Sequence, residues 1–191
     1  MRALDDSLTV IDFETTGAIA GFEDEPWQLG MVRVERGVLV METGVDQLLR
    51  VGDRPFHASA PGRHAQLRDA LREAPTLVSL WPVYRTWWGR PLVAHNAATE
   101  KKWLAKTAPM HPAGPWIDTL KLSRRAFPGL SSYALGDILH SRGLTDQVCA
   151  LSPGRTVHDA LFDAVACGVL LLHILSLPEW TDLSAADLAR V

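Results

Sequence analysis

Hydrophobic residues near the start of the chain occur in short runs rich in β-branched side chains, separated by turn residues. Residues 8–13 read LTVIDF, a pattern typical of a buried central strand. Residues 27–35 and 38–49 are predicted to be the next two strands, with Arg36-Gly37 as the hairpin turn between them. The chain is therefore predicted to begin with three strands in hairpins.

The remainder alternates between helical patterns and short apolar runs. Residues 52–62 contain Gly, Pro, Asp and Ser and are predicted to form a loop. Helices are predicted at 63–73, 76–88, 96–106, 119–127, 133–142 and 158–175, with a short strand at 91–94. Pro75 is expected to open the second helix, and Asn96 and Asp118 are expected to cap the third and fourth. This order predicts an α/β fold, a mixed central sheet flanked by helices.

Length and charge narrow the class of protein. A chain of 191 residues fits one domain, expected to span 1–191, and can bury a sizeable core. The formal charge of −3 argues against a tight, sequence-independent binder of long duplexes, because such proteins carry a basic face. It does not argue against a metal-dependent nuclease, because bound cations can supply the positive charge that attracts phosphates.

Cysteine usage and hydropathy predict a cytoplasmic protein. Cys149 and Cys167 form no CxxC pair and no zinc-ligand spacing, so a reducing compartment is the expected environment. The longest apolar stretch, residues 165–175, is too short to span a bilayer and is predicted to be a buried helix. The first residues include Asp5 and Asp6 and lack the apolar run of a signal peptide. No association with a membrane is expected.

The first candidate site residues are Asp12 and Glu14, at the end of the first predicted strand. Side chains two positions apart on a strand share a face, so the two carboxylates point the same way. Such a pair repels unless a cation or proton lies between them, and oxygen donors suit Mg²⁺ or Mn²⁺. The alternative is a solvated strand end with two surface acids. The apolar run that reaches the acids in TVIDFETTG disfavours this alternative.

A second candidate pair lies at the start of the last long helix. His158 is expected at or just before the helix start, and Asp163 one turn inside it. Asp159 is an alternative to them, because it shares a helix face with Asp163. We interpret Asp159 as an acid that complements the positive end of the helix dipole.

A third candidate lies where a short buried strand ends in His95-Asn96 and a helix begins. Glu100 is expected in the first turns of that helix. It could also be a helix-start acid without a site role, or an exposed partner of Lys101 or Lys102.

The order and spacing of these motifs resemble the DEDDh branch of the DnaQ-like 3′–5′ exonucleases. The family's D-x-E followed by Thr and Gly is matched at residues 12–17, and its H-x(4)-D by His158 and Asp163. Its motif V-A-H-N-A-x-x-D-x-x-x-L is matched at residues 93–104, with Glu100 in place of aspartate. The resemblance covers roughly residues 8–175.

The resemblance implies a ribonuclease H-like fold and a role for each matched residue. Two divalent ions, Mg²⁺ or Mn²⁺, would be held by Asp12, Glu14 and Asp163, with Glu100 acting on the second ion through water. His158 would be the general base. The terminal nucleoside would pack near these residues: Thr15, Thr16, Gly17, His95 and Asn96.

The glutamate at position 100 bears on rate and metal preference more than on reaction class. Glutamate keeps the charge of aspartate on a side chain that is one methylene longer, and Mg²⁺ has stricter coordination geometry than Mn²⁺.

The expected substrate is the 3′ end of a single-stranded nucleic acid or short oligonucleotide. The alternatives are a catalytically weakened nucleic-acid-binding module, an enzyme of free nucleotides, and a polymerase-associated subunit. Residues 176–191 could dock a protein partner, whose identity the sequence leaves open.

Overall fold

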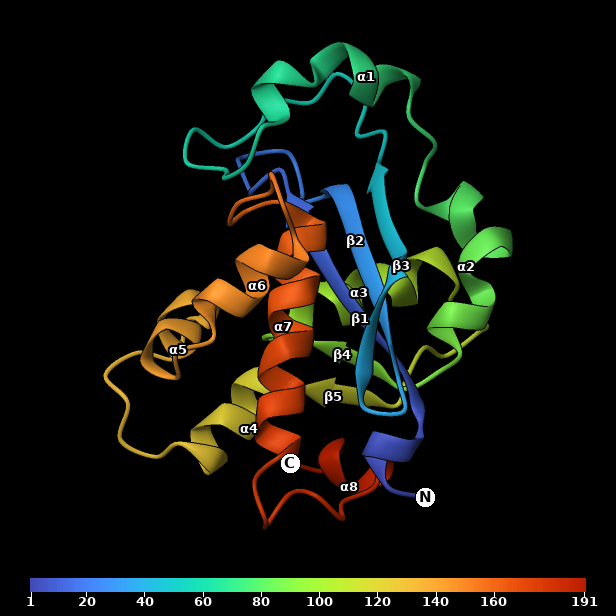
Figure 1. Cartoon of the computed structure of the whole chain (residues 1–191). Coiled ribbons are helices and arrows are strands. Elements are labelled where there is room, and N and C mark those ends of the chain that lie inside the picture. The colour runs from blue at the N-terminus through green and yellow to red at the C-terminus, as the bar shows by residue number, and fades with distance from the viewer.

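The computed structural model describes all residues from Met1 to Val191 and contains one five-stranded sheet (Figure 1). The strands lie in the order β3-β2-β1-β4-β5. Their bounds are β1 Ser7–Thr15, β2 Pro26–Glu35, β3 Val38–Leu48, β4 Leu92–Ala94 and β5 Trp116–Asp118. The first three strands pair antiparallel, and β4 and β5 add in parallel beside β1. The central strand β1 is thus buried between the hairpin strands and the parallel pair.

Helices cover both faces of this sheet (Figure 1). Helix α7 (Ala160–Leu175) crosses β1 and β2 on one face and is buried along nearly its whole length. Its outer side is covered by three shorter helices, which are α4 (Thr119–Ala126), α5 (Leu135–Ser141) and α6 (Thr145–Leu151). The opposite face is covered by α2 (Trp81–Trp88) and α3 (Ala98–Thr107). The sheet is therefore the middle layer of three.

The alternation of side chains along β1 explains where the acidic residues go. Leu8 and Val10 join the large core beneath α7, while Ile11 and Phe13 join the core beneath α2 and α3. Asp12 and Glu14 continue the line of Leu8 and Val10. Both carboxylates therefore face the α7 side of the sheet.

The other elements are short and lie at the edges of the layers. They are α1 (Arg68–Glu73), α8 (Ala185–Leu188) and three 3-10 turns at Ala3–Asp5, His64–Gln66 and Val78–Leu80. A small separate core of Trp27, Val51 and Leu71 lies under the segment that carries α1. No helix combines the length and the hydropathy that a membrane crossing requires.

Several sequence expectations are confirmed and others are wrong. The three hairpin strands are present, and Arg36 and Gly37 both have positive φ, 50° and 73°, as a tight hairpin turn needs. Pro75 does not open a helix, because α2 begins at Trp81 with a proline in its first turn. The helix expected at 63–73 is a 3-10 turn followed by the shorter α1.

Asn96 is not a helix cap. The residue before α3 is Ala97, and Asn96 adopts the left-handed conformation with φ 63°. The carboxylate of Asp118 instead holds the turn before this helix, because it accepts hydrogen bonds from the N–H groups of Asn96 and Ala97. Asp118 caps α4, as expected, through the N–H of Leu120.

Candidate active site

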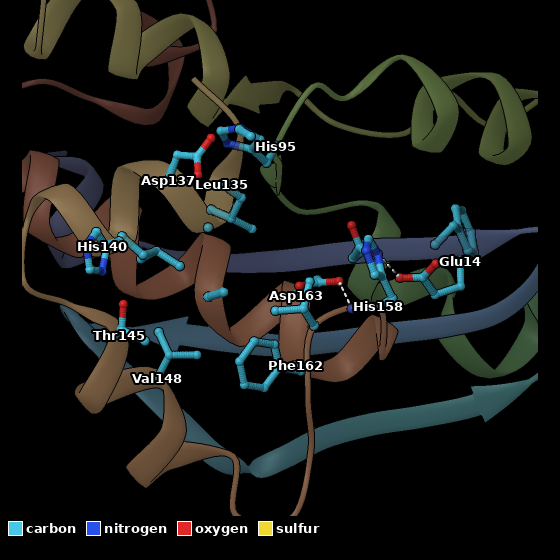
Figure 2. A pocket seen from close by; sticks show the side chains of 17 residues that line it. Glu14, His95, Leu135, Asp137, His140, Thr145, Val148, His158, Phe162 and Asp163 are labelled. Carbon is cyan, nitrogen blue, oxygen red and sulfur yellow. Dashed lines mark hydrogen bonds and ion pairs between the residues drawn. The ribbon is translucent and has the colours of Figure 1, made fainter. Parts of the chain in front are cut away.

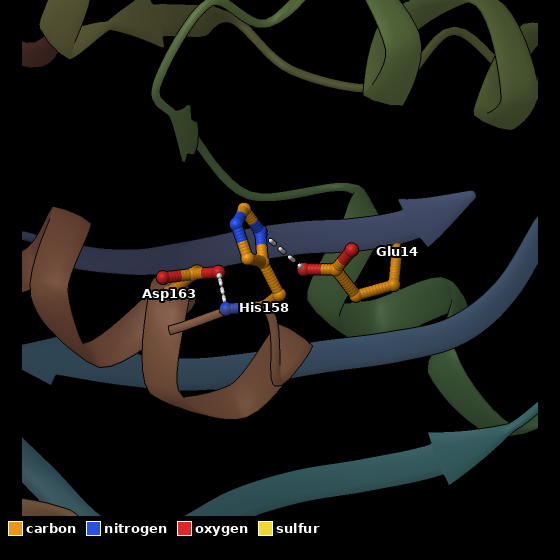
Figure 3. A group of neighbouring side chains, drawn as sticks. All are labelled: Glu14, His158 and Asp163. Atoms are coloured by element: carbon orange, nitrogen blue, oxygen red, sulfur yellow. Dashed lines mark hydrogen bonds and ion pairs between the residues drawn. The ribbon is translucent and has the colours of Figure 1, made fainter. Parts of the chain in front are cut away.

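Acidic side chains gather at the carboxyl end of β1 (Figure 3). Ligand atoms of Glu14, His158 and Asp163 all lie within 4.8 Å of one another. They come from β1, from the loop before α7 and from the first turn of α7. Asp12 lies one pleat before Glu14 and lines the same cavity. The structure therefore brings together both halves of the motif pattern, which are about 150 residues apart in the sequence.

A glycine allows the two halves to meet. Gly30 of β2 pairs directly with Asp12, and a Cβ atom at Gly30 would lie 2.0 Å from the carbonyl oxygen of Ala160. Only a residue without a side chain lets the start of α7 approach β2 this closely. In the sequence, a glycine within an otherwise apolar predicted strand is the feature that indicates this contact.

His158 is held by its backbone and leaves its ring accessible. Its φ is 67°, and its N–H donates to Asp163 Oδ2 at 2.9 Å. Its Nδ1 lies 3.9 Å from Glu14 Oε1, while its side chain is 55% exposed. The ring therefore borders the carboxylates and also faces solvent. A group that takes a proton from a water molecule in the site must later release it to solvent, and this position allows both steps.

Asp159 has a structural role. It is the N-cap of α7 and accepts from the N–H groups of Leu161 and Phe162, each at 3.2 Å. It is also paired with Arg155 at 2.8 Å. The interpretation of Asp159 as a helix-start acid is confirmed, because its oxygens are engaged at the helix end.

Glu100 is a buried acid of α3, not an exposed partner of the neighbouring lysines. It is 5% exposed, and its Oε2 has no hydrogen-bond partner. Lys102 pairs with Glu23 instead. The charge of Glu100 raises the pKa of Asp12, so the two carboxylates lie close enough to interact. A buried carboxylate oxygen without a partner at this place fits a site for a cation.

The electrostatics of the cluster also fit a cation site. Burial, and then the charge of Asp163, raise the pKa of Glu14 to about 8. Burial raises the pKa of Glu100 to about 7 and raises the pKa of Asp163. The pKa of Asp12 is raised by burial and by the other three carboxylates. Buried, mutually repelling oxygen donors are the set that a hard divalent cation neutralises.

A cavity of about 620 Å³ opens from this cluster and runs along α5 and α6 (Figure 2). Its far wall is largely apolar, formed by Leu135, Leu139, Val148 and Phe162. The volume is in the range that holds a small ligand or nucleotide. The carboxylates and the His158 ring thus stand at one end of a cleft that offers an apolar surface.

His95 and Asn96 have mainly positioning contacts. Nε2 of His95 donates to the carbonyl of Tyr133 at 3.0 Å, and Nδ1 meets the hydroxyl of Thr119 at 3.0 Å. Burial lowers the pKa of His95, which keeps the ring neutral and suits these bonds. Both ring nitrogens are therefore engaged, while Asn96 is exposed. Asp118, which organises this turn, was absent from the sequence-predicted site.

The residues after Glu14 anchor a neighbouring segment. Thr16 is buried, its hydroxyl accepts from the N–H of Glu25, and its carbonyl accepts from the N–H of His57 at 2.7 Å. Gly17 has φ 71°, and a Cβ there would lie 2.5 Å from the Cβ of His57. Thr15 ends β1 and is half-buried. A substrate role for these residues stays a prediction.

Comparison with known proteins gives a consistent picture. Residues 9–171 match a family model described as "Exonuclease". Exodeoxyribonuclease 10 of Escherichia coli K12 is 31% identical over 183 residues, which cover 95% of this chain and 74% of that protein. The epsilon subunit of DNA polymerase III from Aquifex aeolicus is 28% identical over 178 residues, covering 90% of this chain and 82% of the subunit.

Solved structures agree in fold. Exonuclease X in complex with 5′ overhanging duplex DNA has a TM-score of 0.68 at 30% identity, covering 95% of this chain and 99% of that chain. The nuclease domain of 3′hExo, a DEDDh family member bound to rAMP, has a TM-score of 0.66 at 17% identity, covering 92% and 94%.

The three-layer fold with a carboxylate cluster at the end of its central strand defines the ribonuclease H-like class to which DEDDh exonucleases belong. Within that class, the chain belongs to the exonuclease family and is homologous to exodeoxyribonuclease 10 and to DnaQ-like epsilon subunits. The expected fold and the expected enzyme class are both confirmed.

Proposed function

We propose that the protein removes nucleotides from the 3′ ends of DNA strands and releases nucleoside 5′-monophosphates. The observation that carries the proposal is the meeting of four carboxylates, two buried and two half-buried, with one exposed imidazole at the head of a cleft. DNA is favoured over RNA as the substrate for two reasons. One relative of about 30% identity is named an exodeoxyribonuclease, and a solved structure of about 30% identity is a complex with DNA. We further propose that residues 1–191 act as one exonuclease domain and work in the cytoplasm.

The same proposal assigns the ligands. Asp12, Glu14 and Asp163 would hold two divalent ions, Mg²⁺ or Mn²⁺, with Glu100 acting on the second through water. When bound, such ions neutralise phosphate charge and make water a stronger nucleophile near neutral pH. A related fold, that of Schizosaccharomyces pombe Pop2p, has been solved in a form bound to Mg²⁺ and Mn²⁺.

The chain's own groups perform the proton transfer and the positioning. His158 Nε2 makes no hydrogen bond within the protein, so it can accept the proton of the attacking water and pass it to solvent. Glu14 lies beside the other ring nitrogen, with its Oε1 3.9 Å from Nδ1. The bond between the His158 N–H and Asp163 holds the histidine beside the same carboxylates that would hold the metal ions.

The proposal is tested with end-labelled single-stranded DNA, duplex DNA, RNA and dinucleotides, each with Mg²⁺ or Mn²⁺. Nucleoside 5′-monophosphates should appear from free 3′ ends, and a 3′-phosphate should block their release. Efficient release from a 5′ end whose 3′ end is blocked would contradict the polarity. Binding of a strand without any turnover would identify a nucleic-acid-binding module instead.

A further inference from the structure

The segment that carries His158 has mostly local hydrogen bonds. It comprises residues 152–159, between the end of α6 and the start of α7 (Figure 3). The backbone hydrogen bonds of this segment, and the bond from the His158 N–H to Asp163, join residues at most five positions apart. Bonds of this kind shape the segment, but they do not fix its place over the sheet.

The side chain of Arg155 connects this segment to a distant strand. Its Nη1 lies 2.7 Å from Asp46 Oδ2 of β3, which is 109 positions away in the sequence. The same nitrogen lies 2.8 and 2.9 Å from the two carboxylate oxygens of Asp159. Arg63 also lies near Asp159, at 3.4 Å, but its side chain is 65% exposed and its ion pair does not extend to Asp46. The bridge from Asp46 through Arg155 to Asp159 therefore depends on Arg155.

The strand end of this bridge is fixed relative to the carboxylate cluster. Asp46 pairs in register with Gly30 of β2, and Gly30 pairs in register with Asp12 of β1. The other oxygen of Asp46 accepts from Gln28 Nε2 at 2.8 Å, and Gln28 is the cross-strand partner of Glu14. The bridge thus ends on a strand position that is aligned with the candidate metal ligands.

The other end of the bridge holds the chain on both sides of His158. Arg155 precedes His158 by three residues, and Asp159 follows it directly. His158 has φ 67°, a left-handed conformation that a residue with a side chain keeps only where its surroundings hold it. The Asp159 side chain is only 6% exposed and the Arg155 side chain 28%, so solvent screens their attraction less than it would at the surface.

We infer that Arg155 is a positioning residue for His158. Through the bridge from Asp46 to Asp159 it sets the place of the His158 ring relative to the carboxylates of β1, and it contacts no reacting atom itself. Without the guanidinium, Asp46 and Asp159 would face each other as like charges, and the segment would move away from β3. This inference rests on the proposed function, because it takes His158 as the group that accepts the proton of the attacking water.

Replacement of Arg155 should separate chemistry from binding. Turnover of an end-labelled decanucleotide with Mn²⁺ should show a kcat lowered by about 10²-fold in Arg155→Gln, the effect of misplacing a reacting group by about 1 Å. KM and the Mn²⁺ affinity measured by calorimetry should stay near the parental values, because every candidate ligand is retained. Arg155→Lys should recover most of kcat, because an ammonium has three donors for the three carboxylate oxygens.

Two further variants show whether the bridge is the cause. Asp46→Ala removes its strand end, and combined with Arg155→Gln it should lower kcat no further than Arg155→Gln alone, because both changes break one connection. Ser184→Ala is the stability control. It removes the side chain that caps α8, far from residues 152–159 (Figure 1), and should lower the melting temperature while leaving kcat unchanged.

A measurement without turnover reports the position of His158 directly. The His158 N–H donates to Asp163, so its hydrogen exchange, followed by NMR, depends on how well the segment is held. Exchange at this amide should be severalfold faster in Arg155→Gln and parental in Ser184→Ala.

The outcomes separate this inference from the proposed function. A parental kcat in Arg155→Gln, an equal loss in Ser184→Ala, or losses that multiply in the double variant would overturn the inference and leave the proposed function intact. A loss of Mn²⁺ affinity as large as the loss of kcat would also overturn it, because the ligands would then have moved. A parent that releases no nucleotide would remove the proposed function, while faster exchange confined to the Arg155 variant would still show that Arg155 holds His158 in place.

Discussion

At the scale of single residues, the four carboxylates at the end of β1 lie without a compensating cation from the protein. The nearby Arg155 and Arg63 make their ion pairs with Asp159, which caps α7. Glu100 even keeps a buried oxygen without a hydrogen bond. Side chains that cost stability and are not neutralised internally are typical of functional sites, because their partner arrives from solution.

The first residue-scale prediction concerns His158. Replacement of His158 by Ala should lower kcat by about 10²–10⁴-fold, the usual contribution of a general base, while Mn²⁺ binding measured by calorimetry stays nearly unchanged. The ring borders the carboxylates, but its removal leaves their oxygens in place. His111→Ala, at an exposed imidazole stacked on Trp81, is the control and should turn over like the parent. A His158→Ala enzyme of parental rate would make His158 a structural residue.

The second prediction concerns Glu100, whose replacement should raise the melting temperature of the metal-free protein and lower its turnover. Glu100→Gln keeps the size and removes a carboxyl whose pKa burial raises to about 7. The metal-free variant should therefore melt at a higher temperature than the parent at pH 8, while its turnover with either metal is largely lost. Glu73→Gln, at an exposed position ending α1, should change neither.

The length of the Glu100 side chain predicts a metal preference. We expect the parent to work better with Mn²⁺ than with Mg²⁺, because Mg²⁺ tolerates displaced ligands less well. Glu100→Asp should retain activity and narrow the difference between the two metals. Parental turnover in Glu100→Gln would show that Glu100 holds no ion.

At the scale of elements, a close backbone approach joins β2 to the start of α7. A Cβ at Gly30 would lie 2.0 Å from backbone atoms of Ala160. Gly30→Ala should therefore push α7 and Asp163 away from Asp12, with a loss of about 1–3 kcal/mol in the free energy of unfolding, as for other overpacked sites. Thermal melting measures this loss, and turnover should fall with it.

Gly136→Ala is the stability control for that prediction. Gly136 lies inside α5 and a Cβ there meets nothing within 4 Å. Alanine should stabilise the helix by about 0.5–1 kcal/mol relative to glycine. If Gly30→Ala melted as high as the parent, α7 would not depend on this approach to place Asp163.

The elements differ in how far the sequence predicts them. The hairpin strands and α7 follow from long, strongly patterned apolar runs, and the D-x-E face follows from the period of a strand. β5, α6 and α8, of 3, 7 and 4 residues, were not predicted, whereas the equally short β4 was, because its apolar run ends at a clear motif. The role of Asp118 in holding the turn before α3 depends on contacts across 21 and 22 positions, which no local pattern contains.

At the scale of the whole molecule, the site is an assembly of distant parts. Asp12 and Glu14 come from β1, Glu100 from α3 and Asp163 from α7, so folding itself concentrates four like charges. Stability and charge state of the cluster are therefore linked. This linkage gives the last prediction, a pH-dependent effect of metal on the stability of the entire chain.

In the metal-free protein, burial raises the pKa of Glu14 from 4.5 to about 8 and that of Glu100 from 4.5 to about 7. Between these values the folded state keeps protons that the unfolded state has released, so the free energy of unfolding falls as pH rises from about 4.5 to about 8.

A divalent cation replaces those protons on the carboxylates. At about 100 times its dissociation constant it adds about 2.7 kcal/mol. The difference in Tm between protein with Mn²⁺ and protein with chelator should therefore be small near pH 5 and large near pH 8. Glu14→Gln should flatten the decline in the metal-free protein. A difference in Tm that is the same at both pH values would show that metal binds elsewhere than at these carboxylates.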